Sequence, residues 1–198
     1  MFEVADSIGI IAFSMSGFFV ATRNSLDLLG VLIATFLTAL GGGIMRDITI
    51  NEIPYTFSHN YPAFIVMNVI IFMIIFKFHK KDSIENKPLF IISDSIGLVS
   101  FSISGALIAI SHNLNLTGVL ALSFITAVGG GIARDIIINE VPFVFKTGFY
   151  GTISLLMALA LYILNELQIV TTYNIVILFI VGVTLRVIAF YQKWSIPL

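Results

Sequence analysis

The sequence predicts an all-α membrane protein with seven transmembrane helices, built from two inverted three-helix repeats and a seventh helix. Three observations lead to this fold class. The 198-residue chain is 58% hydrophobic and only 11% charged, with a mean hydropathy of +1.05, which leaves too little polar surface to cover a soluble globule. Its apolar residues form runs long enough to cross a bilayer. One segment also occurs twice, with the two copies 88 residues apart.

The apolar runs define the predicted spans. A helix needs about 20 apolar residues to cross roughly 30 Å of hydrocarbon. A β-barrel would need segments of alternating polarity, and continuous apolar stretches such as residues 66–76 do not alternate. The links are too short for another domain, so residues 1–198 are expected to form a single transmembrane domain. The predicted spans lie near residues 4–22, 28–50, 61–77, 88–110, 116–138, 148–165 and 172–191.

Lysine and arginine residues in the links predict the orientation, because short cytoplasmic links carry an excess of these residues. The cationic residues of the first, third and fifth links and of the tail all fall on one side of the membrane. The N-terminus is therefore expected outside and the C-terminus in the cytoplasm. These residues are Arg23, Lys77, Lys80, Lys81, Lys87, Lys146 and Lys193.

Composition also excludes several function classes. A formal net charge of -1 provides no basic field for nucleic acid. The absence of cysteine excludes disulfides and thiolate metal sites. The histidines, His59, His79 and His112, lack metal-ligand spacing, and no serine pairs convincingly with a histidine as a catalytic nucleophile would. We therefore expect no enzyme activity, no cofactor and no structural metal.

The repeat predicts the internal architecture. Residues 6–57 align with residues 94–145 without a gap, and 29 of the 52 aligned positions are identical. Each repeat unit, which extends beyond the aligned residues to the next apolar run, holds three spans, so the second unit enters the membrane in the opposite orientation. Inverted repeats of this kind place a polar site near the bilayer midplane, where the two halves meet. We assign residues 4–77 to the first repeat, 88–165 to the second and 172–191 to an additional helix.

Each copy contains three consecutive glycines near the middle of its second span. Glycine costs about 1 kcal/mol relative to alanine in a helix interior, so we expect the second and fifth helices to break or kink there. A break would direct free carbonyls and amides at the same point, and these groups attract cations and anions respectively. Alternatively, the glycines only allow close helix packing. The triplets are Gly41, Gly42 and Gly43, and Gly129, Gly130 and Gly131.

Charged residues follow each triplet while the helix is still within hydrocarbon. An unpaired arginine there costs at least about 3 kcal/mol, so Arg46 and Arg134 should be paired with Asp47 and Asp135. Neighbouring residues point about 100° apart on a helix. We therefore expect the pairs to cross between repeats, Arg46 with Asp135 and Arg134 with Asp47. Alternatively, the paired charges only lock a broken helix and do not contact a permeating solute. Hydroxyl residues matched in both copies could line the same pathway: Ser14, Ser16, Thr38, Ser102, Ser104 and Thr126.

The doubled GGGxxRDxxxNExP segment, the three-plus-three duplication and the seventh span closely resemble the trimeric intracellular cation channel (TRIC) family in its bacterial and archaeal form, over residues 2–191. The resemblance implies a homotrimer in the plasma (inner) membrane of a prokaryote. It implies one pore per subunit, between the repeats and bounded by the second and fifth helices. The implied permeant ions are monovalent cations, K⁺ foremost, passing transiently near the glycine triplets. Pore-facing positions of the family fall on the triplets and on Arg46 and Arg134.

Two other functions stay open. Some bacterial relatives look like glycine carriers, and an alternating-access carrier would bind a small zwitterion through an arginine and an aspartate. A scaffold without transport activity is the remaining alternative. The expected partners are membrane lipids, further copies of the chain, and monovalent cations or a small zwitterion, with no nucleic acid.

Overall fold

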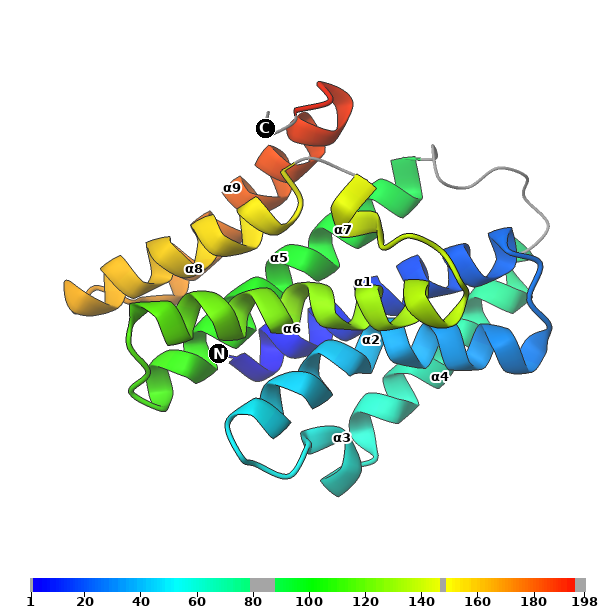
Figure 1. Cartoon of the computed structure of the whole chain (residues 1–198), viewed down its shortest axis with the longest axis horizontal. Helices are drawn as coiled ribbons and strands as arrows, with labels where there is room; N and C mark the ends of the chain where they lie inside the picture. Colours follow the sequence, from blue (N-terminus) through cyan, green and yellow to red (C-terminus); the bar gives the residue numbers. More distant parts are fainter. Residues whose placement is uncertain (1, 79–87, 147–148, 195–198) are drawn as a thin grey trace.

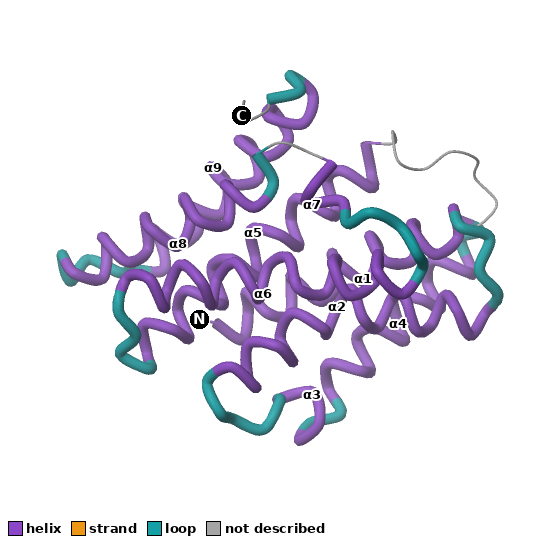
Figure 2. Tube along the Cα trace, viewed as in Figure 1, coloured by secondary structure: helices purple, strands orange, loops and turns teal. Residues whose placement is uncertain are grey.

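The structure is a computed structural model that describes residues 2–78, 88–146 and 149–194. Lys80, Lys81 and Lys87, which contribute to the predicted orientation, lie outside these residues, as does His79. Within the described ranges the chain is all-helical (Figures 1 and 2). The helices are α1 (Phe2–Arg23), α2 (Leu28–Thr49), α3 (Tyr55–Ser58), α4 (Tyr61–Ile75), α5 (Pro88–Ser111), α6 (Leu116–Ile137), α7 (Phe143–Lys146), α8 (Gly151–Glu166) and α9 (Thr172–Tyr191).

Five of the described helices, α1, α2, α5, α6 and α9, are long and apolar enough to cross a membrane. The predicted spans near 61–77 and 148–165 form the shorter apolar helices α4 and α8, of 15 and 16 residues. At 1.5 Å per residue these two helices extend over about 22 to 24 Å, less than the full hydrocarbon thickness.

Local sequence signals explain where α2 and α6 begin and end. The side chain of Asp27 accepts a hydrogen bond from Gly30 N at 2.8 Å, and Asn115 accepts one from Gly118 N at 2.9 Å, which satisfies a free amide at each N-terminus. Just after each helix, Asn51 and its aligned residue Asn139 adopt a left-handed conformation with φ of 59°. Asparagine tolerates this conformation, which stops the helix.

The long helices pack as pairs drawn from the two halves of the chain. The most extensive contacts join α1 with α5 and α2 with α6, followed by α1 with α2 and α5 with α6. α4 lies against α1 and α2, whereas α8 lies against α5 and α6, and α9 packs on α5 and α8 (Figure 1). At the contact between α1 and α5, the rings of Phe13 and Phe101 meet with centroids 5.3 Å apart.

Both α2 and α6 continue as unbroken α-helices through their glycine triplets. The expected break, with free carbonyl and amide ends, is therefore wrong; a bend without loss of the helix stays a prediction. The glycines instead permit a close crossing of the two helices. A Cβ on Gly42 would lie 2.0 Å from the Thr126 carbonyl oxygen, and a Cβ on Gly130 would lie 2.4 Å from the Thr38 carbonyl oxygen. Tight packing between α2 and α6 thus explains these glycines.

Candidate functional site

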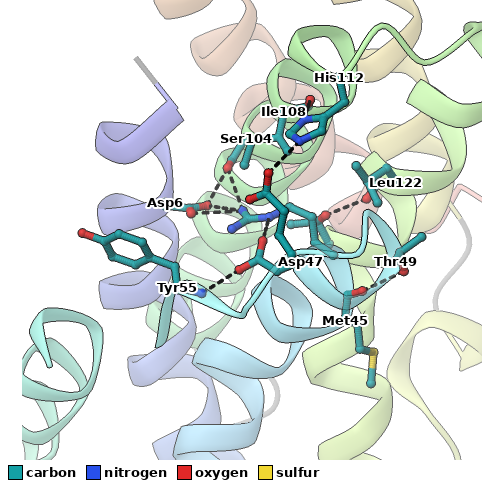
Figure 3. A network of polar contacts seen from close by, with 12 residues as sticks. Asp6, Met45, Asp47, Thr49, Tyr55, Ser104, Ile108, His112 and Leu122 are labelled. Carbon is teal, nitrogen blue, oxygen red and sulfur yellow. Dashed lines mark hydrogen bonds and ion pairs between the residues drawn. The ribbon is translucent and has the colours of Figure 1, made fainter. Parts of the chain in front are cut away.

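A polar cluster brings together Asp6 of α1, Asp47 of α2 and Ser104 of α5 (Figure 3). The guanidinium of Arg46 contacts all three. Its side chain is buried, with 3% of the residue exposed. Nη1 donates to Asp6 Oδ1 and Oδ2 at 2.9 and 3.0 Å and contacts Ser104 Oγ at 3.1 Å, while Nε donates to Asp47 Oδ1 at 2.8 Å. Ser104 Oγ in turn donates to Asp6 Oδ1 at 2.5 Å. One guanidinium is thus compensated by two carboxylates.

The arginine and aspartate of each repeat pair within their own helix. Arg134 Nε donates to Asp135 Oδ1 at 2.8 Å, the same contact that Arg46 makes with Asp47. The predicted pairs across the repeats are therefore wrong. The arginine side chain is long enough to span the 100° step to its neighbour, so Nε reaches the adjacent carboxylate while the Nη atoms extend further.

The second oxygen of each aspartate fixes the turn that follows its helix. Asp47 Oδ2 accepts a hydrogen bond from Tyr55 N at 2.9 Å, and Asp135 Oδ2 accepts one from Phe143 N at 2.8 Å. These amides belong to the first residues of α3 and α7, where the helix has no internal acceptors. Each aspartate therefore links a buried arginine to the next short helix.

Asp94, the residue aligned with Asp6, binds a serine of the opposite repeat as Asp6 does, but its second partner is a tyrosine in place of an arginine. Its Oδ1 accepts hydrogen bonds from Ser16 Oγ at 3.1 Å and from Tyr150 OH at 3.3 Å. Nη1 of Arg134 is buried without a hydrogen-bond partner. The two repeats thus place matched residues in different contacts. Neither first-span aspartate was among the site residues predicted from the sequence, although two aligned acids in apolar spans are a signal of such a role.

Arg186 of α9 is a further buried charge, 1% exposed. Its guanidinium lies over the ring of Tyr150 at 4.7 Å, with Phe190 and Phe143 at 5.7 and 6.0 Å. Its Nε and Nη1 have no hydrogen-bond partner. Arg186 was not predicted as a site residue because α9 lies outside the repeat and offers no aligned counterpart. A single arginine in an apolar span was the available signal.

Two cavities lie at opposite ends of α1. The wide cavity, about 710 Å³, is bounded by residues 2–11 of α1 and by parts of α2, α4 and α5. The narrow cavity, about 10 Å³, is bounded by Val20 and Arg23 near the end of α1 and by residues of α5, α6 and α7. Several of their lining residues are aligned in the repeat, including Arg46 with Arg134 and Asp47 with Asp135. One end of the molecule is therefore open where the matching end is closed.

The wide cavity carries an excess of negative charge. Four carboxylates and one guanidinium line it, a balance of -3 with the histidine neutral: Glu3, Asp6, Asp47, Glu52, Arg46 and His112. At its rim, His112 Nε2 and Glu52 Oε1 lie 2.9 Å apart. This hydrogen bond, together with the one to the Ile108 carbonyl, raises the pKa of His112 above its ordinary value, against a lesser effect of burial.

Basic residues close the narrow cavity. Glu140 Oε1 pairs with Arg23, and Glu140 Oε2 lies 3.5 Å from Lys146 Nζ. Burial by itself raises the pKa of Glu140, but the hydrogen bonds from Arg23 and Asn24 and the charges of Arg23 and Lys146 outweigh burial, so this pKa is lowered. With Arg134 and Asp135, this cavity has three cationic and two anionic residues, a balance of +1.

The predicted hydroxyl residues are all buried. Four of them, Ser14, Thr38, Ser102 and Thr126, donate to the carbonyl four residues earlier in their own helix at 2.6 Å. Of the predicted site residues, Arg46, Asp47, Arg134 and Asp135 line the two cavities, whereas the six hydroxyl residues and the glycines line neither. Ser16 and Ser104 instead hold the first-span aspartate of the opposite repeat.

Comparison with known proteins identifies the family. A family model described as "Glycine transporter" matches residues 3–79 and 91–166. The UPF0126 membrane protein YvgT of Bacillus subtilis is 33% identical over 195 residues, covering 98% of this chain and 95% of the relative. The chain belongs to the family that this model describes and that includes the UPF0126 membrane proteins. A UPF0126 membrane protein of Deinococcus radiodurans is 38% identical over 137 residues, 69% of this chain and 63% of the relative.

Solved structures extend the likeness to the fold. One, described under "Structural basis for conductance through TRIC cation channels", is 34% identical, with a TM-score of 0.85 and coverage of 100% of this chain and 97% of the other. A prokaryotic TRIC channel crystallised in 0.5 M KCl is 28% identical, with a TM-score of 0.86 and 98% coverage of both chains. The predicted TRIC-family membership is confirmed, and this family member is an all-helical, multi-pass membrane protein.

Proposed function

We propose that this protein is a monovalent cation channel that conducts K⁺ through one pore in each subunit of a homotrimer. The pore lies between two inverted repeats, residues 4–77 and 88–165, with 172–191 as an additional span. In this arrangement α4 and α8 also cross the membrane, giving seven crossings with the N-terminus outside. The similarity to two structures of TRIC channels, one of them described as a cation channel, supports this proposal.

The observation that carries the proposal is the charge of the wide cavity. Four carboxylates against one guanidinium raise the local concentration of cations and repel anions. Arg46 at its deep end would oppose a cation if it were unpaired. Because Asp6 and Asp47 both bind its guanidinium, the cluster as a whole is anionic. The wide cavity therefore suits a cation entrance.

The route beyond Arg46 runs between the repeats toward Arg134. Gly43 and Gly131, the third glycine of each triplet, leave space beside these arginines, since a Cβ on either glycine would lie 3.8 or 3.9 Å from the guanidinium. We place the transient K⁺ positions there, in a pathway that uses Arg46, Asp47, Arg134 and Asp135 and that a bend of α2 and α6 would widen. The narrow cavity at the far end corresponds to a closed pore.

The test is cation conductance of the purified protein in a planar bilayer under a KCl gradient. We expect a reversal potential close to that of K⁺, and neutralising Asp6 and Glu52 together should shift it toward that of Cl⁻. A protein that inserts and conducts no K⁺, or whose ion selectivity is unaffected by these substitutions, would contradict the proposal. Thr49→Ala, an exposed position on α2 that does not line the cavity, is the control.

Glycine transport is the second candidate, favoured by the description of the matching family model. A guanidinium between carboxylates is also suited to a zwitterion, whose carboxylate would bind Arg46 and whose ammonium would bind Asp6. Saturable uptake of labelled glycine into proteoliposomes, measured beside K⁺ flux in the same preparation, separates the candidates. A channel shows K⁺ flux without saturable glycine uptake.

A further inference from the structure

The two repeats hold matched residues in two different arrangements within one molecule. In the first, Asp6 pairs with Arg46, and Nη1 of this arginine is satisfied. In the second, Asp94 binds Ser16 and Tyr150, and Nη1 of Arg134 is buried without a partner. The first arrangement accompanies the wide cavity and the second the narrow one. The pairing of the first-span aspartate therefore differs between the open end and the closed end.

Two groups of the second half account for the position of Asp94. Tyr150, just before α8, donates its hydroxyl to Asp94, whereas Tyr61, at the start of α4 in the first half, contacts Ser7 Oγ with its hydroxyl. Arg186 covers the ring of Tyr150 from α9, which has no counterpart in the first repeat. The carboxylate of Asp94 interacts electrostatically with both Arg186 and Arg134. Asp94 thus lies within the field of two arginines while its hydrogen bonds go to hydroxyls.

We propose that Tyr150 and Arg186 are positioning residues that hold Asp94 away from Arg134, and that the narrow cavity opens when Asp94 moves from Tyr150 to Arg134. The open state of the second half would then reproduce the contact between Asp6 and Arg46. This inference rests on the proposed function in one respect: the narrow cavity is taken as one end of the transport pathway.

The move of Asp94 from Tyr150 to Arg134 exchanges one hydrogen bond for another. Moving Asp94 satisfies the free Nη1 of Arg134 and leaves the Tyr150 hydroxyl without its acceptor, so one hydrogen bond replaces another. Two arrangements that differ by one such exchange are close in free energy, which is the condition for a conformational switch. Arg186 favours the closed arrangement because its charge attracts Asp94 and its guanidinium stacks on the Tyr150 ring.

Cysteine labelling tests this inference without any ion flux. The chain contains no cysteine, so Val20→Cys in the narrow cavity and its aligned counterpart Ile108→Cys in the wide cavity each introduce a single thiol. The probe is a charged methanethiosulfonate applied to detergent-solubilised protein, which exposes both ends. We expect slow modification of the Val20→Cys variant and fast modification of the Ile108→Cys variant.

Tyr150→Phe keeps the ring under Arg186 but removes the hydroxyl that binds Asp94. Loss of a hydrogen bond to a charged group should speed modification of the Val20→Cys variant by about tenfold, with no change for Ile108→Cys. Tyr162→Phe, on helix α8, which Tyr150 directly precedes, is the control and should change neither rate. Adding Arg134→Gln to Tyr150→Phe removes the new partner of Asp94, so the gain should disappear.

An unchanged labelling rate at position 20 in Tyr150→Phe would overturn the role of Tyr150. A gain that persists with Arg134→Gln would overturn the exchange onto Arg134. Arg186→Lys keeps the charge but loses the planar stacking on Tyr150, so it should raise the labelling rate at position 20 less than Tyr150→Phe does. If Arg186→Lys left this rate unchanged, Arg186 would have no part in holding Asp94. Because none of these rates depends on conduction, a failed K⁺ measurement with the expected labelling would affect only the proposed function.

Discussion

Replacing Gly42 by alanine tests whether the glycine triplets serve close packing or a helix break. If the triplet weakened the helix, alanine at any of its three positions would strengthen α2 by up to about 1 kcal/mol. The packing explanation expects different results along the triplet. A Cβ on Gly42 would lie 2.0 Å from the Thr126 carbonyl oxygen, whereas a Cβ on Gly43 would meet its nearest neighbour, the guanidinium of Arg46, at 3.8 Å.

The magnitude follows from these distances. An ordinary contact needs about 3.4 Å or more, so α2 and α6 would have to separate by more than 1 Å to accommodate alanine at position 42. Overpacking of this kind costs roughly 1–3 kcal/mol or more, because backbone rather than a flexible side chain must move. The gain in helix propensity offsets about 1 kcal/mol of it. Gly42→Ala should therefore be destabilising, whereas Gly43→Ala should be neutral or slightly stabilising.

The assay is thermal unfolding of the purified protein in detergent, with Gly42→Ala and Gly43→Ala compared in the same preparation. At about 2–4 °C per kcal/mol for a chain of this size, the two variants should differ in Tm by several degrees. Gly130→Ala and Gly131→Ala repeat the comparison in α6, where the corresponding distances are 2.4 and 3.9 Å. Equal melting temperatures for the two members of each pair would refute the packing explanation.

Three further outcomes are expected. Arg46→Gln leaves the carboxylates of its cluster without a cation and should lower the free energy of unfolding by about 3–5 kcal/mol. Adding Asp6→Asn should restore part of this stability. If it restored none, the pair of Arg46 and Asp6 would not contribute to stability. The raised pKa of His112 means that its contact with Glu52 stabilises the fold below the unfolded pKa of about 6.5 and is lost as pH rises through the folded value. Melting curves of wild type and Glu52→Gln should therefore converge at high pH, and a constant gap would count against the contact. The lowered pKa of Glu140 gives the opposite pH dependence: its contribution to stability is present above the unfolded pKa and is lost as pH falls through the folded pKa. Glu140→Gln should therefore lower stability at neutral pH and have little effect in acid. A larger loss of stability in acid would contradict this assignment.

The asymmetry of the two ends connects these predictions to transport. Aligned arginine and aspartate residues line a cavity of about 710 Å³ at one end and about 10 Å³ at the other. A duplicated sequence does not have to adopt two identical conformations, because each half packs against different neighbours. Here the second half alone contacts α9 extensively, and that helix places Arg186 over Phe143, which lines the narrow cavity.

Several features were predictable because they depend on neighbouring residues. Helix caps such as Asp27 and Asn115 act on amides three residues away, and apolar runs long enough to span a bilayer are visible in any window of the chain. The buried arginines were predictable as paired charges, because an unpaired one within hydrocarbon is costly. The identity of their partners was not, and the expected pairs across the repeats were wrong.

By itself, the sequence determined that the chain is a helical membrane protein, duplicated at an offset of 88 residues, with an arginine and an aspartate after each glycine triplet. Tertiary structure alone decided that the triplets are contacts between continuous helices, that Asp6 rather than a residue of α6 satisfies Arg46, and that Arg186 lies over the ring of Tyr150, whose hydroxyl binds Asp94. The physical reason is the sequence separation of the residues that interact. Helix formation and membrane insertion depend on a few adjacent residues, whereas partners 40 or more residues apart meet only through the packing of whole helices.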